Sequence, residues 1–162
     1  MVSGETGHRG ANGGLIGALD RLLAARRKDI LVGVPADKTL RAGDAMNNAS
    51  LLFIHTNGSP VRGIPARPVI EPALRYHQEK ITAQIQKMLL AAARNDERGV
   101  QLYAKRVGMA GQNAVRDWFT NPANGWPPNS FTTIARKGSS RPLIDTGSLR
   151  KSIIYVIRGE NG

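Results

Sequence analysis

The sequence contains no cysteine among its 162 residues. Disulfide bonds and thiolate metal sites are therefore excluded, and the composition suits a reducing compartment. The chain also lacks a run of roughly 18 apolar residues, the length that a membrane-spanning helix needs. Residues 1–14 contain no apolar segment of the kind found in secretory signals. We therefore expect a soluble protein.

Acidic and aromatic residues are scarce. The 12 Asp and Glu residues stand against 23 Lys and Arg residues, which gives a net charge of +11. Such an excess favours a polyanionic neighbour, namely nucleic acid, an acidic membrane surface or an acidic protein ring. The three Tyr, three Phe and two Trp residues are too few and too scattered to predict a base-stacking platform.

The N-terminal residues differ from the rest of the chain. Residues 1–14 include five glycines and almost nothing to bury, so we interpret them as a flexible arm. Residues 15–162 have the size of a single domain. The first apolar residues of this domain, from Leu15 to Leu23, recur at helical spacing. Ile30–Val34 then predicts a short strand that Pro35 ends.

The segment of residues 45–55 is either a strand or a helix, because a four-residue apolar run does not separate the two. Small residues before the run and Asn57-Gly58 after it favour a helix that ends at a glycine. His55 is a conceivable metal ligand or base. However, no second His, no Cys and no acidic cluster lies at ligand spacing, so we predict no metal and no cofactor.

Two long helices are the largest local feature. The first begins at Pro68 or Pro72 and ends near Asn95-Asp96, and the second carries an apolar face from Val100 to Phe119. The short break predicts an antiparallel pair or one bent helix. Gly108 and Gly111 in the second helix either permit a close contact or weaken it.

Two proline-rich loops flank these helices. The first, Ser59–Pro68, is stiff and basic, so it is either an interaction surface or a connector that happens to hold arginines. Trp126, in the second loop, either pins that loop to the core or meets a partner. The candidate interaction residues across the chain are Val61, Arg62, Ile64, Arg67, Trp126, Arg136, Lys137 and Arg150.

The C-terminal third begins with a short helical segment, residues 131–138, that ends at Gly138. Asp145 and Thr146 can cap a following helix start. Ile153–Ile157 is β-branched or aromatic throughout and predicts a strand. Because this strand is apolar on both faces, we expect it to be buried on both, in a sheet interior or against a partner subunit. Together these elements predict an α+β fold, with a small β-sheet packed with two long helices in a single domain.

Several blocks of the chain resemble, in order, the phage tail-completion or virion-morphogenesis proteins. The two more specific blocks are Ile64–Pro68 (Ile-Pro-Ala-Arg-Pro), which runs into a long helix, and Pro142–Ile153 (Pro-Leu-Ile-Asp-Thr-Gly-x-Leu-Arg-x-Ser-Ile). The others are Leu52–Gly58, a Trp-Pro-Pro loop at Trp126, and Thr133–Gly138. The likeness spans roughly residues 30 to 158, and the glycine-rich arm does not align with the family.

The resemblance implies a non-enzymatic virion protein in the neck of a tailed bacteriophage. Such proteins look like α+β subunits that form a ring, of six copies by the same resemblance, at the head-proximal end of the tail. The implied partners are further copies of the chain, neighbouring connector and tail-tube proteins and, non-specifically, phage DNA, but no membrane. Tail completion, termination of tube growth and closure of the head all stay open.

Two other function classes compete with this one. Asp145–Ser148 (Asp-Thr-Gly-Ser) matches the short signature of aspartic proteases, but no second such motif exists and too little chain follows it. A basic nucleic-acid-binding module fits the charge. However, the sequence shows no clear helix-turn-helix and no zinc ligands, and its basic residues are spread along the chain.

Overall fold

The computed structural model describes residues 14–35, 47–138, 140, 142–143 and 147–159, without the side chains of Arg26, Arg136 and Lys137. The expected flexible arm therefore lies outside the described residues, except for Gly14. In chain order the elements are α1 (Leu15–Arg26), β1 (Asp29–Gly33), α2 (Asn48–Asn57), η1 (Pro60–Arg62), α3 (Ile70–Tyr76), α4 (Gln78–Ala93), α5 (Glu97–Trp118), η2 (Pro122–Asn124), α6 (Phe131–Lys137), α7 (Ser148–Ser152) and β2 (Ile154–Arg158).

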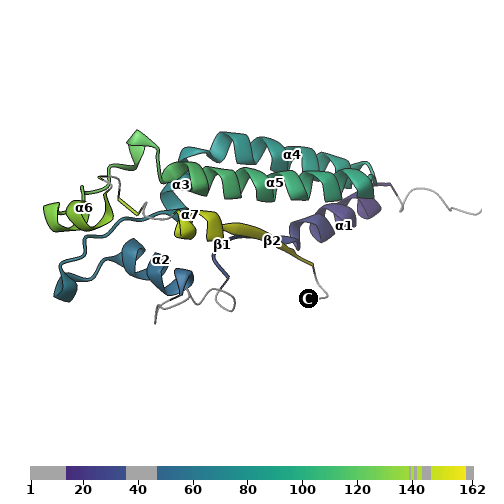
Figure 1. The fold of residues 1–162 in the computed structure, drawn as a ribbon. Helices are drawn as coiled ribbons and strands as arrows, with labels where there is room; N and C mark the ends of the chain where they lie inside the picture. Colours follow the sequence, from purple (N-terminus) through teal and green to yellow (C-terminus); the bar gives the residue numbers. More distant parts are fainter. Residues whose placement is uncertain (1–13, 36–46, 139, 141, 144–146, 160–162) are drawn as a thin grey trace, which may run out of the picture.

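Helices α4 and α5 lie side by side and form one layer of the fold (Figure 1). Only residues 94–96 join them, so the chain reverses and the pair is antiparallel. Asp96 caps the second helix, because its Oδ1 accepts a hydrogen bond from the Gly99 amide at 2.8 Å. The antiparallel alternative is thus the one that the molecule adopts.

The second layer contains α1 and a sheet of two strands (Figure 1). Strand β1 pairs antiparallel with β2, with Asp29 opposite Arg158 and Gly33 opposite Ile154. The sheet packs on α5, where Gly108 and Gly111 permit the close approach. A Cβ atom at Gly108 would overlap the Tyr155 ring, and one at Gly111 would lie 2.9 Å from Val32 Cγ2. The small sheet against two long helices confirms the predicted α+β fold.

The outer face of this sheet differs from the expectation. Ile154 and Val156 of β2 and Leu31 of β1 are exposed, while their neighbours along each strand turn toward α5. The prediction of a sheet interior is therefore wrong, because the described sheet has only two strands and one of its faces is uncovered. Burial of that face against a partner subunit stays a prediction.

The first long helix is interrupted once. The sequence predicts one helix up to Asn95, whereas the structure has α3 and α4 with a break at His77. Neither Gly nor Pro marks this point. Instead, contacts with the end of α5 hold it: the Tyr76 ring lies 5.4 Å from the Trp118 ring, and His77 Nε2 lies 3.3 Å from Asp117 Oδ2. Long-range packing therefore bends a locally uniform helical sequence.

Both shorter predicted helices are confirmed. Asn47 caps α2 by accepting a hydrogen bond from the Ser50 amide at 2.7 Å, and the helix ends before Gly58. Helix α6 ends at Gly138, whose φ of 65° is the left-handed conformation that favours glycine. We expect Leu149–Ser152 to form a short polar turn, whereas the structure has the helix α7 there. Asp145 and Thr146, its expected caps, lie outside the described residues.

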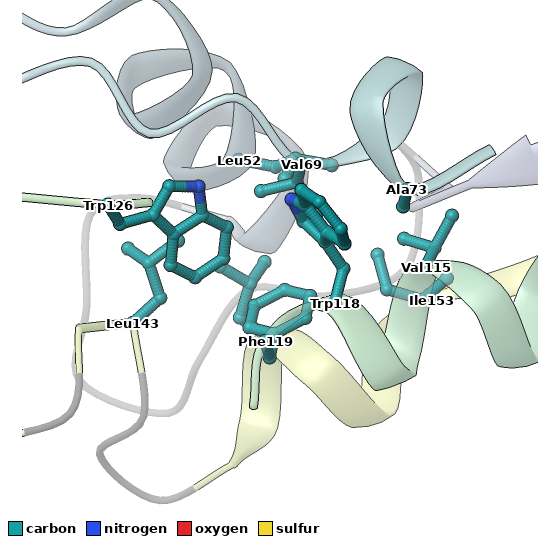
Figure 2. Packing of buried hydrophobic residues seen from close by; sticks show 10 residues of the cluster. Leu52, Val69, Ala73, Val115, Trp118, Phe119, Trp126, Leu143 and Ile153 are labelled. Carbon is teal, nitrogen blue, oxygen red and sulfur yellow. The ribbon is translucent and has the colours of Figure 1, made fainter. Parts of the chain in front are cut away.

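Two clusters of buried side chains form the core. The aromatic cluster joins α2, α3, α5, α7 and the second proline-rich loop (Figure 2), and it comprises Leu52, Val69, Ala73, Val115, Trp118, Phe119, Trp126, Leu143, Leu149 and Ile153. The alanine cluster joins α1, α4 and α5, and it comprises Ala25, Met88, Ala91, Ala92, Val100 and Ala104. The fold therefore has a large-residue core toward α2 and a small-residue core toward α1.

Candidate interaction surface

The first proline-rich loop is closed by its own backbone. The Ser59 amide donates to the Ile64 carbonyl at 2.8 Å, and the Ile64 amide donates to the Ser59 carbonyl at 3.0 Å. Between them η1 forms a tight turn with Val61 at its tip, 99% exposed. A loop that is already ordered loses little conformational entropy when it binds a partner. The predicted stiffness of this loop therefore has a physical basis in these bonds.

Gly58 brings the start of this loop against its end. Its φ of 74° and ψ of 177° belong to a region that side chains rarely adopt. A Cβ atom at Gly58 would also lie 2.8 Å from the Ala66 nitrogen and 2.9 Å from the Ile64 carbonyl oxygen. The Asn-Gly pair that predicts the end of α2 thus also makes room for the returning loop.

Arg67 lies inside the molecule, not on its surface. Its side chain is only 6% exposed and clasps the second proline-rich loop. The guanidinium donates to the Pro127 carbonyl at 2.9 and 3.1 Å and to the Pro128 carbonyl at 3.1 Å. Burial lowers the pKa of Arg67, although an arginine stays charged at neutral pH. Arg67 is therefore a positioning residue, and the expectation of a surface contact at this position is wrong.

Trp126 makes the reciprocal contact. Its indole is buried, its Nε1 donates to the Pro68 carbonyl at 3.0 Å, and its ring meets Phe119 edge to face at 5.8 Å (Figure 2). Of the two predicted alternatives, the structure supports the pin to the core over a partner contact. Arg67 and Trp126 together lock the two proline-rich loops to one another.

The locked loops border an open groove of about 1190 Å³. Its walls come from α2, the first loop, the residues before α6, the start of α6, and the start of α7. Arg62 and Ile64 line it, and Phe131, which is 92% exposed, stands at its edge. No Asp or Glu lies among the described residues that line it. The described lining therefore presents apolar side chains together with the positive charge of Arg62.

The other predicted interaction residues lie elsewhere. Arg150, in α7, donates from Nε to the Arg116 carbonyl at 2.8 Å, so it fastens α7 to α5. Arg116 in turn donates to the Ile153 carbonyl at 2.8 Å, at the entry to β2. Arg136 and Lys137 end α6, and their side chains lie outside the description. The structure thus brings Val61, Arg62 and Ile64 together on one loop beside the groove.

A second exposed apolar surface was missed in the sequence-based prediction. Helix α1 presents Leu15, Ile16, Leu19 and Leu23 to solvent, with Leu15 83% exposed. The signal was present, because leucines occupy more of this helix than a single buried face needs. We call this set the α1 surface. Helix α1 lies at one end of the molecule, and the groove, with α2 and α6, lies at the other (Figure 1).

Other kinds of site find no support in the described part of the chain. No group of three His, Asp or Glu residues there could hold a metal ion. No helix there is both long and apolar enough to cross a membrane. No family model, no curated protein and no solved structure matches this sequence.

Proposed function

We propose that this chain is a structural virion protein of a tailed bacteriophage, and that it forms a ring at the head-proximal end of the tail. In this role it completes or terminates the tail and is needed for head–tail joining. The observation that carries the proposal is the pair of unlike exposed surfaces at opposite ends of one subunit. A protein that joins two different assemblies needs one docking surface for each of them.

The groove end offers exposed apolar side chains on a rigid frame. Val61 of η1 and Phe131 of α6 are exposed there, and Phe131 lines a groove that lacks acidic residues in its described lining. Exposed apolar groups that gather on one region mark interaction sites more often than isolated ones do. This end suits an apolar or acidic segment of a neighbouring virion protein.

The α1 end offers a helix face with a different chemistry. Its exposed residues are mainly leucines, and Asp20, Arg27 and Lys28 lie among or beside them. A leucine-bearing helix face docks best into an apolar groove or against another helix. Since the two ends present different elements and different side chains, they suit two different partners.

The resemblance gives the second line of support. The blocks Leu52–Gly58 and Ile64–Pro68 meet the Trp-Pro-Pro loop, which is far from them in the sequence, at the groove end. Arg67 of the second block bonds to Pro127 and Pro128 of that loop, and Trp126 bonds back to Pro68. Three of the five blocks that carry the likeness therefore lie together. The net charge of +11 also suits acidic neighbouring rings or the passing DNA.

Electron microscopy of lysates from a phage that lacks this gene tests the proposal. Full heads beside free tails of normal length would indicate tail completion. Tails of abnormal, extended length would indicate a terminator, and heads that have lost their DNA would indicate head closure. Normal infectious particles would contradict the neck function altogether.

The second candidate is a basic nucleic-acid-binding module, and one observation favours it. Arg98, Lys105 and Arg106 are exposed on α5, at spacings that place them along one side of the helix. A ring around DNA would also bind DNA without sequence preference and with a steep salt dependence. Only a measurable preference for one DNA sequence over another, in competition binding, would favour the dedicated module.

A further inference from the structure

The sheet has two edges with no strand beside them among the described residues. Strand β1 has one such edge and β2 has the other, because the two strands pair only with each other. Proteins that keep a sheet edge unpaired protect it with lysine, proline or a bulge. Neither strand contains Lys or Pro, and the register runs without a bulge from Asp29 to Gly33. Both edges therefore retain the features of a strand that can pair.

The outer face of the sheet is also exposed to solvent. Leu31 faces Val156 across the two strands, and Ile154 lies beside them, all three on the exposed face. Together with Val34 and Pro35 they border a shallow hollow of about 450 Å³. This face and the two edges form one continuous surface, which we call the sheet surface.

We propose that β1 of one copy pairs with β2 of a second copy, antiparallel and in the register that the two strands already use within a subunit. Leu31 then lies opposite Val156 of the neighbour, and Asp29 lies opposite Arg158 of the neighbour. The contact joins two different edges, so it is heterologous and repeats from copy to copy. It deepens the proposed ring, on which its biological meaning rests, by assigning the lateral contact between subunits.

Charge selects this pairing over the two symmetric ones. Each strand carries one charged residue, Asp29 at the start of β1 and Arg158 at the end of β2. If two copies paired through their β1 edges about Leu31, Asp29 would face Gly33. If they paired through their β2 edges about Val156, Arg158 would face Ile154. All three pairings keep the apolar residues on one face, but only the pairing of β1 with β2 sets opposite charges against each other.

The orientation of the strands leaves both ends of the molecule accessible. Strand β2 runs along α5, roughly in the direction of the long helices (Figure 1). A copy added at a strand edge therefore lies beside the first copy and not at its groove end or its α1 end. Lateral pairing through the sheet surface and docking at the two ends are thus compatible in one particle.

Cross-linking tests the pairing directly, because the chain has no cysteine of its own. Leu31→Cys and Val156→Cys are made in separate, differently tagged full-length chains, mixed under oxidising conditions and separated without reductant. Directly opposed residues on adjacent strands lie within the distance that a disulfide spans. We expect the mixed disulfide in clear excess over both homodimers. Leu102→Cys, on the exposed side of α5, measures cross-linking by random collision.

Two outcomes overturn the proposal. Homodimers of Leu31→Cys or of Val156→Cys in excess over the mixed product would show a two-fold contact instead. Cross-linking no greater than that of Leu102→Cys would show that the edges do not meet. Electron microscopy of the same samples separates this failure from failure of the proposed function. If rings are seen without the cross-link, the proposed ring stands and only the strand pairing is rejected.

Charge reversal supplies a second, independent measurement. Asp29→Lys in the Leu31→Cys chain should lower the yield of mixed disulfide by roughly fivefold at most, the effect of one cross-strand charge pair. Arg158→Glu in the Val156→Cys partner should then restore the yield. Each substitution also disturbs the pair within its own subunit, so an internal effect alone would make the double combination worse. A further loss of yield in that combination would contradict the register.

Discussion

The groove end and the α1 end of this molecule are built in different ways. At the groove end, two tryptophans and a phenylalanine fill the core, and Arg67 and Trp126 bond one loop to the other. At the α1 end, four alanines with Met88 and Val100 form the core. Large aromatic residues bury more apolar area per residue than alanine does. The stability of the groove end should therefore depend strongly on a few side chains, whereas a single substitution at the α1 end should cost less.

The largest expected effect is at Trp126. Trp126→Ala removes a buried indole and its bond to Pro68, so it should lower the free energy of unfolding by about 3–5 kcal/mol. Urea denaturation monitored by circular dichroism measures this. Phe131→Ala, an aromatic truncation on the exposed side of the same end, is the matched control and should change stability by less than about 0.5 kcal/mol. Equal effects of the two variants would show that Trp126 does not pin the loop.

Gly58→Ala should come next. The new Cβ would meet backbone atoms of Ile64 and Ala66 in a strained backbone region, which should cost about 2–3 kcal/mol. Gly125→Ala is the control, because Gly125 also has a positive φ, 58°, but nothing lies within 4 Å of its Cβ position. Thermal unfolding of the two variants gives the comparison. A loss at Gly125 as large as that at Gly58 would mean that backbone strain alone, without the contact, sets the cost.

Arg67→Met should be somewhat milder. It removes three hydrogen bonds between the loops while retaining an apolar side chain of similar length, so we expect a loss of about 1–3 kcal/mol. Hydrogen exchange should show faster opening around Arg67 and Trp126 and unchanged protection in α1 and α4. Arg62→Met, at an exposed position of the same loop, is the control. Unchanged exchange at Trp126 in the Arg67 variant would contradict the proposed clasp.

The smallest effect is expected at the α1 end. Arg21 donates to the Ala92 and Ala93 carbonyls at 3.3 and 3.5 Å and so links α1 to α4. Arg21→Ala should cost about 1 kcal/mol and release α1 selectively, seen as faster amide exchange in residues 15–26. Leu19→Ala, on the exposed side of α1, should leave exchange unchanged. Loss of protection at the groove end as well would show that the two cores unfold as one.

Local signals predicted most of the elements. The Asn-Gly pair after α2, Gly138 after α6 and the break at Asn95-Asp96 all act within a few residues, so they are readable from the chain. The helix break at His77 could not be read from the sequence, because it coincides with contacts to Trp118 and Asp117 at the far end of α5. The groove could not be predicted either, since its walls combine α2 and the first proline-rich loop with residues near α6 and α7, far along the chain. Arg67 was predicted as a surface contact because its internal acceptors, Pro127 and Pro128, lie 60 residues away or more.

The apolar character of β2 was predicted, but the structure leaves one face of this strand exposed where burial on both faces was expected. Alternation of exposure along a strand depends on how many layers the sheet has, and the sequence of the strand does not contain that number. The same limit applies to α1, where extra leucines indicate a second contact without naming what makes it. In both places apolar residues remain exposed without a covering element among the described residues.

The central claim is that the two ends of the subunit bind different assemblies. The most direct test is to supply a phage that lacks this gene with variants in which each end is disabled separately. One variant carries Val61→Asp and Phe131→Asp, and the other carries Leu15→Asp and Leu19→Asp; all four positions are exposed, so both proteins should fold. Heads and tails from each lysate are purified and probed for the protein. If the two ends bind different assemblies, one variant should remain on one particle type and the other variant on the other. If both variants remain on the same particle, or both still join heads to tails, the two-surface account is contradicted.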